Sequence, residues 1–318
     1  MMVSSPASTL CSPVSAIATS LQWRSLPLAR YLDMVPKCSA FAPTTGVYLH
    51  PHHSEDPKQF FQRYIFQPSN CQWSNPIQFG APTADTTGAF QQRKVLFTGD
   101  SHARYAYDLL MNVYAGEWDA YLRAAPRQEG IKSNTFGPAV FDFYWEPVLH
   151  EIRIQLNCSF IAQYDTVVLG AGQHNAVYIP EEKREHGQQY TLHAWEQLIH
   201  KLAQKLSPET CPDQRMPKVI WLGTPARVVR VVPASNSSWM DGRSSRRMRL
   251  YDEIAWDQFK TLPGAARVDM FALSQPFVND FRDMQHMPLT DGLAALLQDI
   301  HEKIRPTELA VKHVELTK

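Results

Sequence analysis

Apolar positions along this chain follow two alternating patterns, one typical of buried strands and one typical of amphipathic helices. Six apolar runs predict strands, at residues 94–98, 139–145, 151–156, 166–169, 218–222 and 266–272. The run at 151–156 is a candidate antiparallel strand. The runs at 94–98, 166–169 and 218–222 are each followed by a glycine, which is typical of the end of a central parallel strand.

Helical spacing of apolar residues is found in four segments, at 102–114, 191–206, 244–262 and 290–304. The second segment forms one stripe of Leu192, Trp195, Leu198, Ile199, Leu202 and Leu206. The last segment forms one face of Leu293, Leu296, Leu297 and Ile300. Strands that alternate with helices predict a mainly parallel sheet, covered on both faces and joined by right-handed crossovers.

Ligands of such sheets bind at the carboxyl ends of the strands. The three strands that end at glycine are therefore expected to point at one shared rim. The α/β pattern extends over residues 93–306 and is followed by a tail at 307–318. Residues 1–35 are rich in Ser, Pro and Ala and are expected to be disordered or processed. Residues 36–92 show little periodicity and predict a loop-rich extension packed on the α/β domain.

Charge argues against two classes of partner. The 318 residues include 31 Lys and Arg and 31 Asp and Glu, so the formal net charge is zero. This balance does not favour nucleic acid or an anionic membrane surface. No window approaches 18 uninterrupted apolar residues, which predicts no membrane span. Arg24 and Arg30 interrupt any signal-like apolar core, so the protein is either cytosolic or a secretory precursor whose true start is missing.

Five cysteines are present, at positions 11, 38, 71, 158 and 211. None of them forms a close Cys-x-x-Cys pair of the kind that binds zinc or performs redox chemistry. The odd count leaves at least one thiol unpaired. Two glycosylation sequons, at Asn157 and Asn236, lean toward the secretory pathway.

The strand at 94–98 runs into Gly99-Asp100-Ser101 and then into a helix. A serine on this turn lies at the carboxyl end of a strand and near a helix N-terminus, where backbone N–H groups and the helix dipole stabilise an anion. Ser101 is therefore a candidate nucleophile. The alternative is that Ser101 only caps the helix, with Asp100 in the turn.

A serine nucleophile needs a base and a group that orients the base. Asp283-Met284-Gln285-His286 follows the last predicted strand and returns to the same rim. Residues three apart lie side by side on a helical turn, so Asp283 can fix the tautomer of His286, which then accepts the Ser101 proton. The alternative is an exposed loop pair or a capping aspartate.

Other polar clusters carry weaker signals. His174 follows a strand at the same rim and either contacts substrate or is structural. His50, His52 and His53 lack supporting carboxylate or cysteine spacing, so neither a metal nor a cofactor is expected. The basic run Arg243, Arg246, Arg247 and Arg249 is expected to be a solvated helix face, with an anion site as the alternative.

Taken in order, these motifs resemble the PC-esterase group of SGNH (GDSL-like) hydrolases. That group includes plant trichome-birefringence-like polysaccharide O-acetyltransferases, lumenal domains of sialate O-acetyltransferases and the C-terminal domains of neurexophilin-and-PC-esterase proteins. Arg104 completes a Gly-Asp-Ser-x-x-Arg pattern. Similar family segments are the aromatic run 143–149, the block 165–174, the region 239–247, and the upstream stretches around Cys38 and Cys71. The resemblance covers roughly residues 36–304.

The resemblance implies a three-layer α/β/α sandwich with Ser101 as nucleophile, His286 as base and Asp283 as orienting acid. It implies no cofactor and no metal. It places an oxyanion and substrate rim at Gly99, Asp100, Arg104, Gly170, Gly172, Gln173, His174 and Asn175. The Ser101 backbone N–H is one expected oxyanion donor.

The chain departs from the wider superfamily at the oxyanion hole. The usual asparagine donor aligns with Gly170 or is displaced to Asn175, with Gly172 and Gln173 as alternatives. Another conserved glycine of the superfamily, also near the oxyanion hole, aligns with either Gly130 or Gly137, and the sequence does not decide between these two. The membrane anchor usual in Golgi members is missing from this chain.

The function implied is acyl transfer through an acyl-serine, from a small acyl donor to a sugar hydroxyl or from a glycan ester to water. The expected location is the Golgi lumen or outside the cell, and the oligomeric state is open. The aromatic and histidine residues of the extension have two possible roles. They form a wall on which sugars stack, or they simply cover one edge of the sheet. These residues are Tyr48, His50, His52, Phe60, Phe61, Tyr64 and Trp73. The rival functions are a non-catalytic glycan-binding protein on the same fold and a lipid or small-ester hydrolase of the same superfamily.

Overall fold

A computed structural model describes residues 46–49, 65–68, 71, 77, 93–116, 131–150, 156–177, 190–226, 244–275 and 291–304. Within them, six strands form one sheet in the order β4-β5-β3-β6-β7-β8. Their bounds are β3 (Lys94–Gly99), β4 (Ile131–Phe136), β5 (Ala139–Trp145), β6 (Thr166–Gly170), β7 (Lys218–Leu222) and β8 (Ala266–Val268). Only β4 runs antiparallel to its neighbour. The prediction of a mainly parallel sheet is confirmed.

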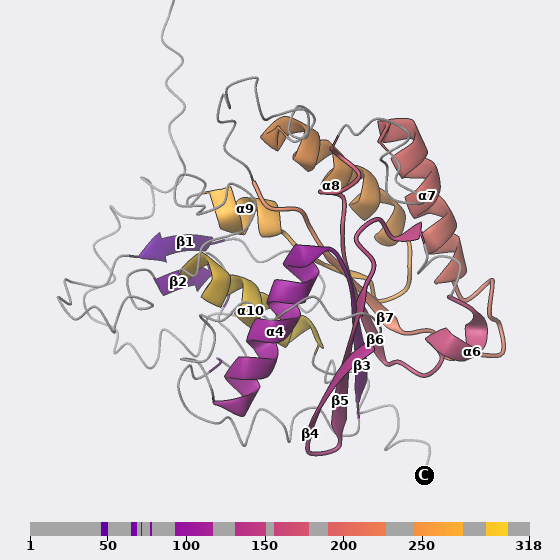
Figure 1. The fold of residues 1–318 in the computed structure, drawn as a ribbon, viewed down its shortest axis with the longest axis horizontal. Coiled ribbons are helices and arrows are strands. Elements are labelled where there is room, and N and C mark those ends of the chain that lie inside the picture. Colours follow the sequence, from indigo (N-terminus) through magenta and orange to yellow (C-terminus); the bar gives the residue numbers. More distant parts are fainter. Residues whose placement is uncertain are drawn as a thin grey trace, which may run out of the picture.

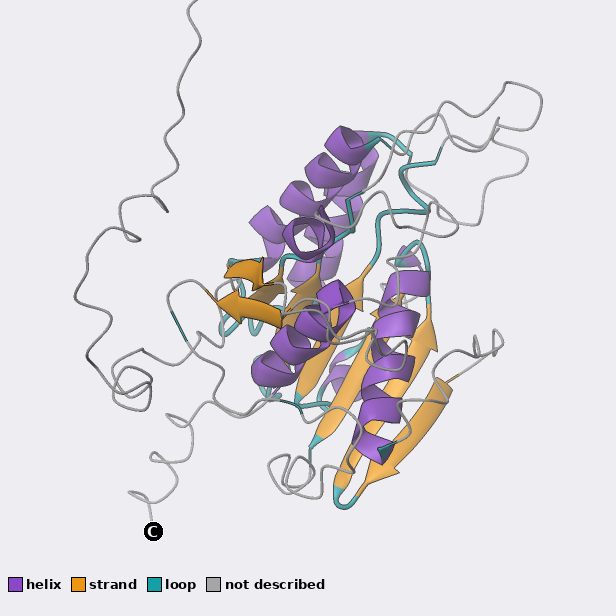
Figure 2. Ribbon diagram, turned by 90° about the vertical axis from the view of Figure 1, so that its left-hand side faces the viewer, coloured by secondary structure: helices purple, strands orange, loops and turns teal. Residues whose placement is uncertain are grey.

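Helices cover both faces of this sheet, which makes a three-layer α/β/α sandwich (Figures 1 and 2). One layer contains α4 (Ser101–Ala115), α9 (Met270–Ser274) and α10 (Asp291–Ile304). The other contains α6 (Cys158–Ile161), α7 (Leu192–Lys205) and α8 (Ser245–Phe259). Each layer has its own hydrophobic cluster, because side chains along a strand alternate between the two faces.

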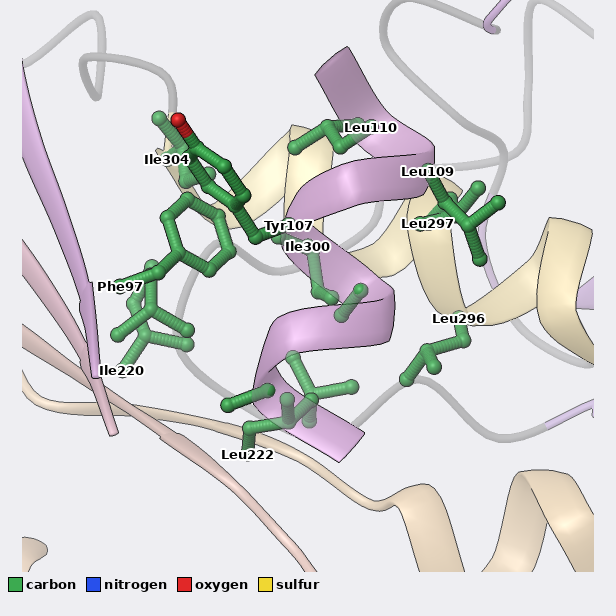
Figure 3. Close-up of a cluster of buried hydrophobic side chains, with 14 of the residues drawn as sticks. Phe97, Tyr107, Leu109, Leu110, Ile220, Leu222, Leu296, Leu297, Ile300 and Ile304 are labelled. Carbon is green, nitrogen blue, oxygen red and sulfur yellow. The ribbon is translucent and has the colours of Figure 1, made fainter. Parts of the chain in front are cut away.

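The cluster beneath α4 shows how the nucleophile helix is held. Phe97 and Ile220 from the sheet, Tyr107 from α4, and Leu297 and Ile300 from α10 are all fully buried in it (Figure 3). The ring of Tyr107 meets the ring of Phe97 edge to face, with centroids 5.5 Å apart. This packing fixes α4 over the centre of the sheet.

Strand β3 lies between β5 and β6, so the chain first adds strands on one side of β3 and then on the other. In an open α/β sheet, the carboxyl edge at such a reversal is where ligands bind. The first residues after β3 and β6 are therefore at the favoured position. The expectation that β3, β6 and β7 end at one edge is confirmed, because the three strands are adjacent and parallel.

The predicted helices coincide closely with α4, α7 and α10. Side-chain caps explain two of the starts, since Thr191 accepts from Ala194 N–H and begins α7, and Ser244 accepts from Arg247 N–H and begins α8. Helix α8 ends at Phe259, three residues earlier than the pattern predicts. Here residues 260–262 turn away from the helix toward β8.

Three strand predictions need correction or comment. The strand predicted at 266–272 ends at Val268, because Asp269 accepts from Ala272 N–H at 2.9 Å and begins α9. Strand β4 was not predicted, since its exposed and half-buried positions alternate without a buried face. The strand predicted at 151–156 lies outside the described residues except for Leu156, which is buried in a loop.

The extension is described only in part. Strands β1 (Gly46–Leu49) and β2 (Ile65–Pro68) pair antiparallel as a separate two-stranded sheet. Ile77 is buried in the α4 cluster, and its N–H donates to Gln298 Oε1 on α10 at 2.6 Å. At this residue the extension packs on the α/β domain.

Two further features complete the fold. Cys158 and Cys211 form a disulfide with a Cα–Cα distance of 5.6 Å, and Cys71 is also disulfide-bonded. In the part of the chain that the structure describes, no helix has both the length and the apolar character to cross a bilayer.

Candidate active site

Ser101 is the first residue of α4 and directly follows the turn after β3. The residue that caps the helix is Asp100, whose carboxylate accepts from the His102 N–H at 2.9 Å. The alternative in which Ser101 is the cap is therefore wrong. Ser101 is 8% exposed, at the edge of the sheet where ligands are expected.

The turn before Ser101 depends on two glycines. Gly99 has a φ of 142°, and a Cβ on it would lie 1.8 Å from the carbonyl oxygen of Gly170. That same carbonyl accepts from the Asp100 N–H at 2.9 Å, while the Gly99 carbonyl accepts from the Glu146 N–H at 3.0 Å. The ends of β3, β5 and β6 are thus tied together immediately before the nucleophile.

Electrostatics around the turn involve Asp100 and two histidines. Burial alone would raise the pKa of Asp100, but hydrogen bonds from His102 and the charges of His102 and His174 outweigh burial and lower that pKa. His102 Nδ1 lies 3.4 Å from Asp100 Oδ1. Asp100 is therefore a carboxylate at neutral pH, and its negative charge is engaged by the first turn of α4.

Arg104, Trp145 and His174 gather at the same edge. Trp145 ends β5 in register with Gly99, which is in register with Gly170 on its other side. The Arg104 guanidinium lies over the Trp145 ring, 5.4 Å from its centroid. His174, from the loop after β6, meets the Trp145 ring edge to face at 6.1 Å. Arg104 and His174 were expected at the rim, whereas Trp145 was noted only as part of an aromatic segment.

The loop after β6 separates two candidates for the oxyanion donor. Gly170 has no side chain to donate, and a Cβ there would lie 3.2 Å from an atom of Ala103 and from one of Leu222, so the position is tightly packed. Asn175 is fully buried, and its Nδ2 lies 3.5 Å from the Val148 carbonyl. The Nδ2 atom is thus turned toward Val148.

Gly172 and Gln173 also belong to this loop. Gly172 has a φ of 120° and packs against Thr224 and Trp195, where a larger residue would be crowded. Gln173 is 1% exposed. The positive φ of Gly172 makes the sharp turn that carries the chain from β6 toward His174.

A network missed by the sequence analysis holds this loop. The Tyr251 hydroxyl on α8 lies between two backbone carbonyls, that of Tyr190 and, at 3.3 Å, that of Asn175. Arg247 donates to Tyr251 Oη at 3.1 Å, and its guanidinium lies 4.3 Å from the centroid of the Tyr190 ring. The only sequence feature that pointed to these contacts was the run of arginines at 243–249, which includes Arg247.

The basic run therefore does not behave as one surface. Arg246 is exposed, as expected of a solvated face. Arg247 contributes to the tyrosine network, and Arg249 pairs with Glu253 at 2.7 Å and with Asp269 at 3.2 Å. For Arg247 the solvated-face interpretation is wrong, because its guanidinium packs into the tyrosine network, whereas Arg249 stays partly exposed in its pair with the exposed Glu253. Arg243 lies outside the described residues.

Several predicted residues are not placed by the structure. Asp283 and His286 lie outside the described residues, as do Gly130 and the side chains of the proposed sugar-stacking wall. Gly137 forms the turn between β4 and β5, at the amino end of β5, so it is on the opposite edge from Ser101. It cannot contribute to the oxyanion rim.

Comparison with known proteins gives weak likenesses of fold. No family model matches the sequence, and no curated protein matches it. An S15A mutant of the acetylxylan esterase Axe2 from Geobacillus stearothermophilus is 15% identical, with a TM-score of 0.43 over 67% of this chain and 94% of that chain. A lipase/acylhydrolase from Enterococcus faecalis is 15% identical, with a TM-score of 0.41 over 68% of this chain and 99% of that chain.

A third similar structure is LAE5, an alpha/beta hydrolase from the metagenome of Lake Arreo, Spain. It is 13% identical, with a TM-score of 0.38 over 66% of this chain and 92% of that chain. At such identities and TM-scores, the likenesses decide nothing about activity. The α/β/α sandwich rests on the strands and helices of this chain, and the candidate site rests on its own residues.

Proposed function

We propose that this protein is a serine-dependent O-acyl esterase or O-acyltransferase of the SGNH hydrolase superfamily, within its PC-esterase group. The observation that carries the proposal is the position of Ser101. It begins α4 directly after the central strand, at the sheet reversal, while Asp100 performs the capping. A serine held there without a capping duty is well placed to act as a nucleophile.

In the proposed mechanism, Ser101 Oγ attacks the carbonyl carbon of an ester, and His286 accepts the hydroxyl proton. The tetrahedral intermediate collapses, the bond to the leaving oxygen breaks, and His286 returns the proton to that oxygen. Asp283 orients the His286 ring. Water or a sugar hydroxyl then attacks the acyl-serine with the same base, which regenerates Ser101 and releases an acid or a new ester.

The negative charge of the tetrahedral intermediate needs preorganised donors. The N-terminus of α4 supplies one end of a helix dipole and the Ser101 backbone N–H. Because Gly170 has no side chain and Asn175 Nδ2 is turned toward the Val148 carbonyl, backbone N–H groups such as that of Gly172 are the proposed partners.

The proposed substrate is an acylated, in particular acetylated, glycan or polysaccharide, with a small acyl donor if the enzyme is a transferase. The proposed location is the Golgi lumen or the outside of the cell. The Cys158–Cys211 disulfide supports passage through an oxidising compartment, where such bonds persist.

Labelling with a fluorophosphonate, followed by an acetyl-ester assay, tests the proposal. Wild type is expected to be labelled at Ser101 and to release acetate, and Ser101→Ala to do neither. Ser245→Ala is the matched control, because Ser245 is the first residue of α8 but lies on another helix. Equal labelling of wild type and Ser101→Ala contradicts the proposal, and so does loss of labelling in Ser245→Ala alone.

A further inference from the structure

The guanidinium of Arg104 is a polar group that the local structure leaves incompletely satisfied. Its Nη1 atom is buried, and no hydrogen-bond acceptor meets it among the described residues. Its contacts there are with aromatic rings, those of Tyr105 at 5.5 Å and Trp145 at 5.4 Å. A buried donor without an acceptor is costly, so a bound acceptor at this point would be favoured.

The position of Arg104 connects this donor to the nucleophile. Arg104 follows Ser101 by three residues on α4, a spacing that places two side chains on the same face of a helix. Trp145, over which the guanidinium lies, is level with Gly99 at the carboxyl edge. A group bound by Arg104 is therefore about one helical turn from the reacting ester.

The other charges at this edge do not neutralise Arg104. Asp100 is engaged by His102, and the carboxylate of Glu146 accepts from the His150 N–H at 3.2 Å. His174 also lies at this edge, where its ring and that of Trp145 are 6.1 Å apart in an edge-to-face arrangement. The positive charge of Arg104 therefore has no carboxylate partner among these residues, which favours the binding of an anion beside it.

The geometry of Trp145 distinguishes an acidic sugar from a neutral one. A neutral sugar would be expected to stack on an aromatic face. The Arg104 guanidinium lies over a face of Trp145, and His174 meets the same ring in an edge-to-face arrangement. A planar guanidinium supported by an aromatic ring is instead well suited to hold a carboxylate through two parallel hydrogen bonds.

We propose that Arg104 is a specificity-determining residue that binds a carboxylate on the sugar unit undergoing acyl transfer, so that the substrate is an acidic glycan. This inference rests on the function proposed above and narrows its substrate class. Arg104 binds the anion, and Trp145 holds the guanidinium flat toward the rim. Ser101 reacts with an ester on the same or an adjacent sugar.

A matched pair of esters tests the inference, namely methyl 2-O-acetyl-glucuronoside and methyl 2-O-acetyl-glucoside, which differ in the carboxylate. Wild type is expected to prefer the acidic ester by about tenfold or more in kcat/KM, as for a charge-assisted contact. Arg104→Gln should bring this ratio close to one, and Arg104→Lys should keep part of it. The exposed Arg246, changed to Gln, should leave the ratio at its wild-type value. No preference in wild type, or an unchanged ratio in Arg104→Gln, overturns the inference.

Failure of this inference is distinguishable from failure of the proposed function. If Ser101 is labelled and both esters are cleaved equally, only the acidic specificity is wrong. If Ser101 is not labelled, calorimetry with methyl glucuronoside and methyl glucoside still decides the anion site. Binding of the acid alone, lost in Arg104→Gln and kept in Arg246→Gln, supports the site, whereas equal or absent binding of both sugars refutes it.

Discussion

Gly99 and Gly170 approach so closely that a Cβ on Gly99 would lie 1.8 Å from the Gly170 carbonyl oxygen. Neighbouring parallel strands here end in direct backbone contact, and the Asp100 N–H closes the contact with a hydrogen bond of 2.9 Å. The nucleophile turn is therefore built by main-chain atoms of two strands. Its shape depends on the absence of a side chain at one position.

Gly99→Ala is expected to lose far more stability than another glycine with positive φ. Gly137 is the matched control, since its φ is 56° and a Cβ there meets nothing within 4 Å. Gly137→Ala should cost about 1–2 kcal/mol of unfolding free energy from backbone strain alone. Gly99→Ala should cost several kcal/mol, because strain is joined by a steric clash. Urea unfolding compares the two variants, and similar losses would contradict the close contact.

The buried pair of Asp252 and Arg267 ties α8 to β8. Arg267 Nη2 lies 2.6 Å from Asp252 Oδ2, and Trp221 Nε1 donates to the other carboxylate oxygen at 2.6 Å. Asp252→Ala leaves the buried guanidinium unpaired and is expected to cost about 3–5 kcal/mol. The double variant with Arg267→Met should lose less than the two single losses combined. Additive losses in this double-mutant cycle would show that the pair is not coupled.

Lys218 makes stability depend on alkaline pH. Burial, together with the charges of Lys303 and Arg93, lowers the pKa of Lys218 from 10.5 to about 8. The folded state therefore binds the Lys218 proton less tightly than the unfolded state does. The protonated lysine lowers the free energy of unfolding by its full amount below pH 8, and this loss of stability disappears as the pH rises from 8 toward 10.5. Between about pH 7 and about pH 10, wild type should gain roughly 2 kcal/mol relative to Lys218→Met.

Urea unfolding at the two pH values measures this gain. Lys201→Met is the control, because Lys201 is exposed on α7, and its difference from wild type should be the same at both pH values. A constant difference between wild type and Lys218→Met would contradict the prediction.

The disulfide between Cys158 and Cys211 closes a loop with a sequence separation of 53. A loop of this length is expected to contribute about 4 kcal/mol through the unfolded state. Cys158→Ser combined with Cys211→Ser should be less stable by up to this amount, and in the presence of reductant wild type and the double variant should be equally stable, since reductant also opens the disulfide of Cys71 in both. Alkylation and mass spectrometry of the protein from its own cells should find the pair oxidised. Free thiols at both positions would contradict the proposed secretory location.

Sequence patterns predicted the parts of the fold that are governed by periodicity and capping. The buried runs ending at Gly99 and Gly170 became adjacent parallel strands, and the stripe that includes Trp195 became the buried face of α7. Strand β4 escaped prediction because it is an edge strand whose pairing with β5 depends on a hairpin at Gly137, not on burial. The end of β8 was missed because one capping side chain, that of Asp269, converts a strand-like sequence into a helix.

Prediction of the site had a similar limit. Ser101 and His174 were found because each lies near the end of a predicted element, and Arg104 was found because it completes the Gly-Asp-Ser-x-x-Arg pattern of the family that the chain resembles. The sequence did not distinguish Asp100 from Ser101 as the cap, since both residue types cap helices well. The tie from Tyr251 to the Asn175 carbonyl joins residues 76 positions apart and has no local signature. The roles of Asp283 and His286 remain predictions.

The helix that begins with Ser101 packs tightly against the sheet, and ten of its 15 residues are buried. Tyr107, Leu109 and Leu110 are fully buried between the sheet and α10 (Figure 3). A nucleophile at the first residue of such a helix has no local hinge of its own. Heat inactivation of Ser101 labelling is therefore expected to coincide with melting of the whole domain, with no earlier phase in which the protein is folded but inert.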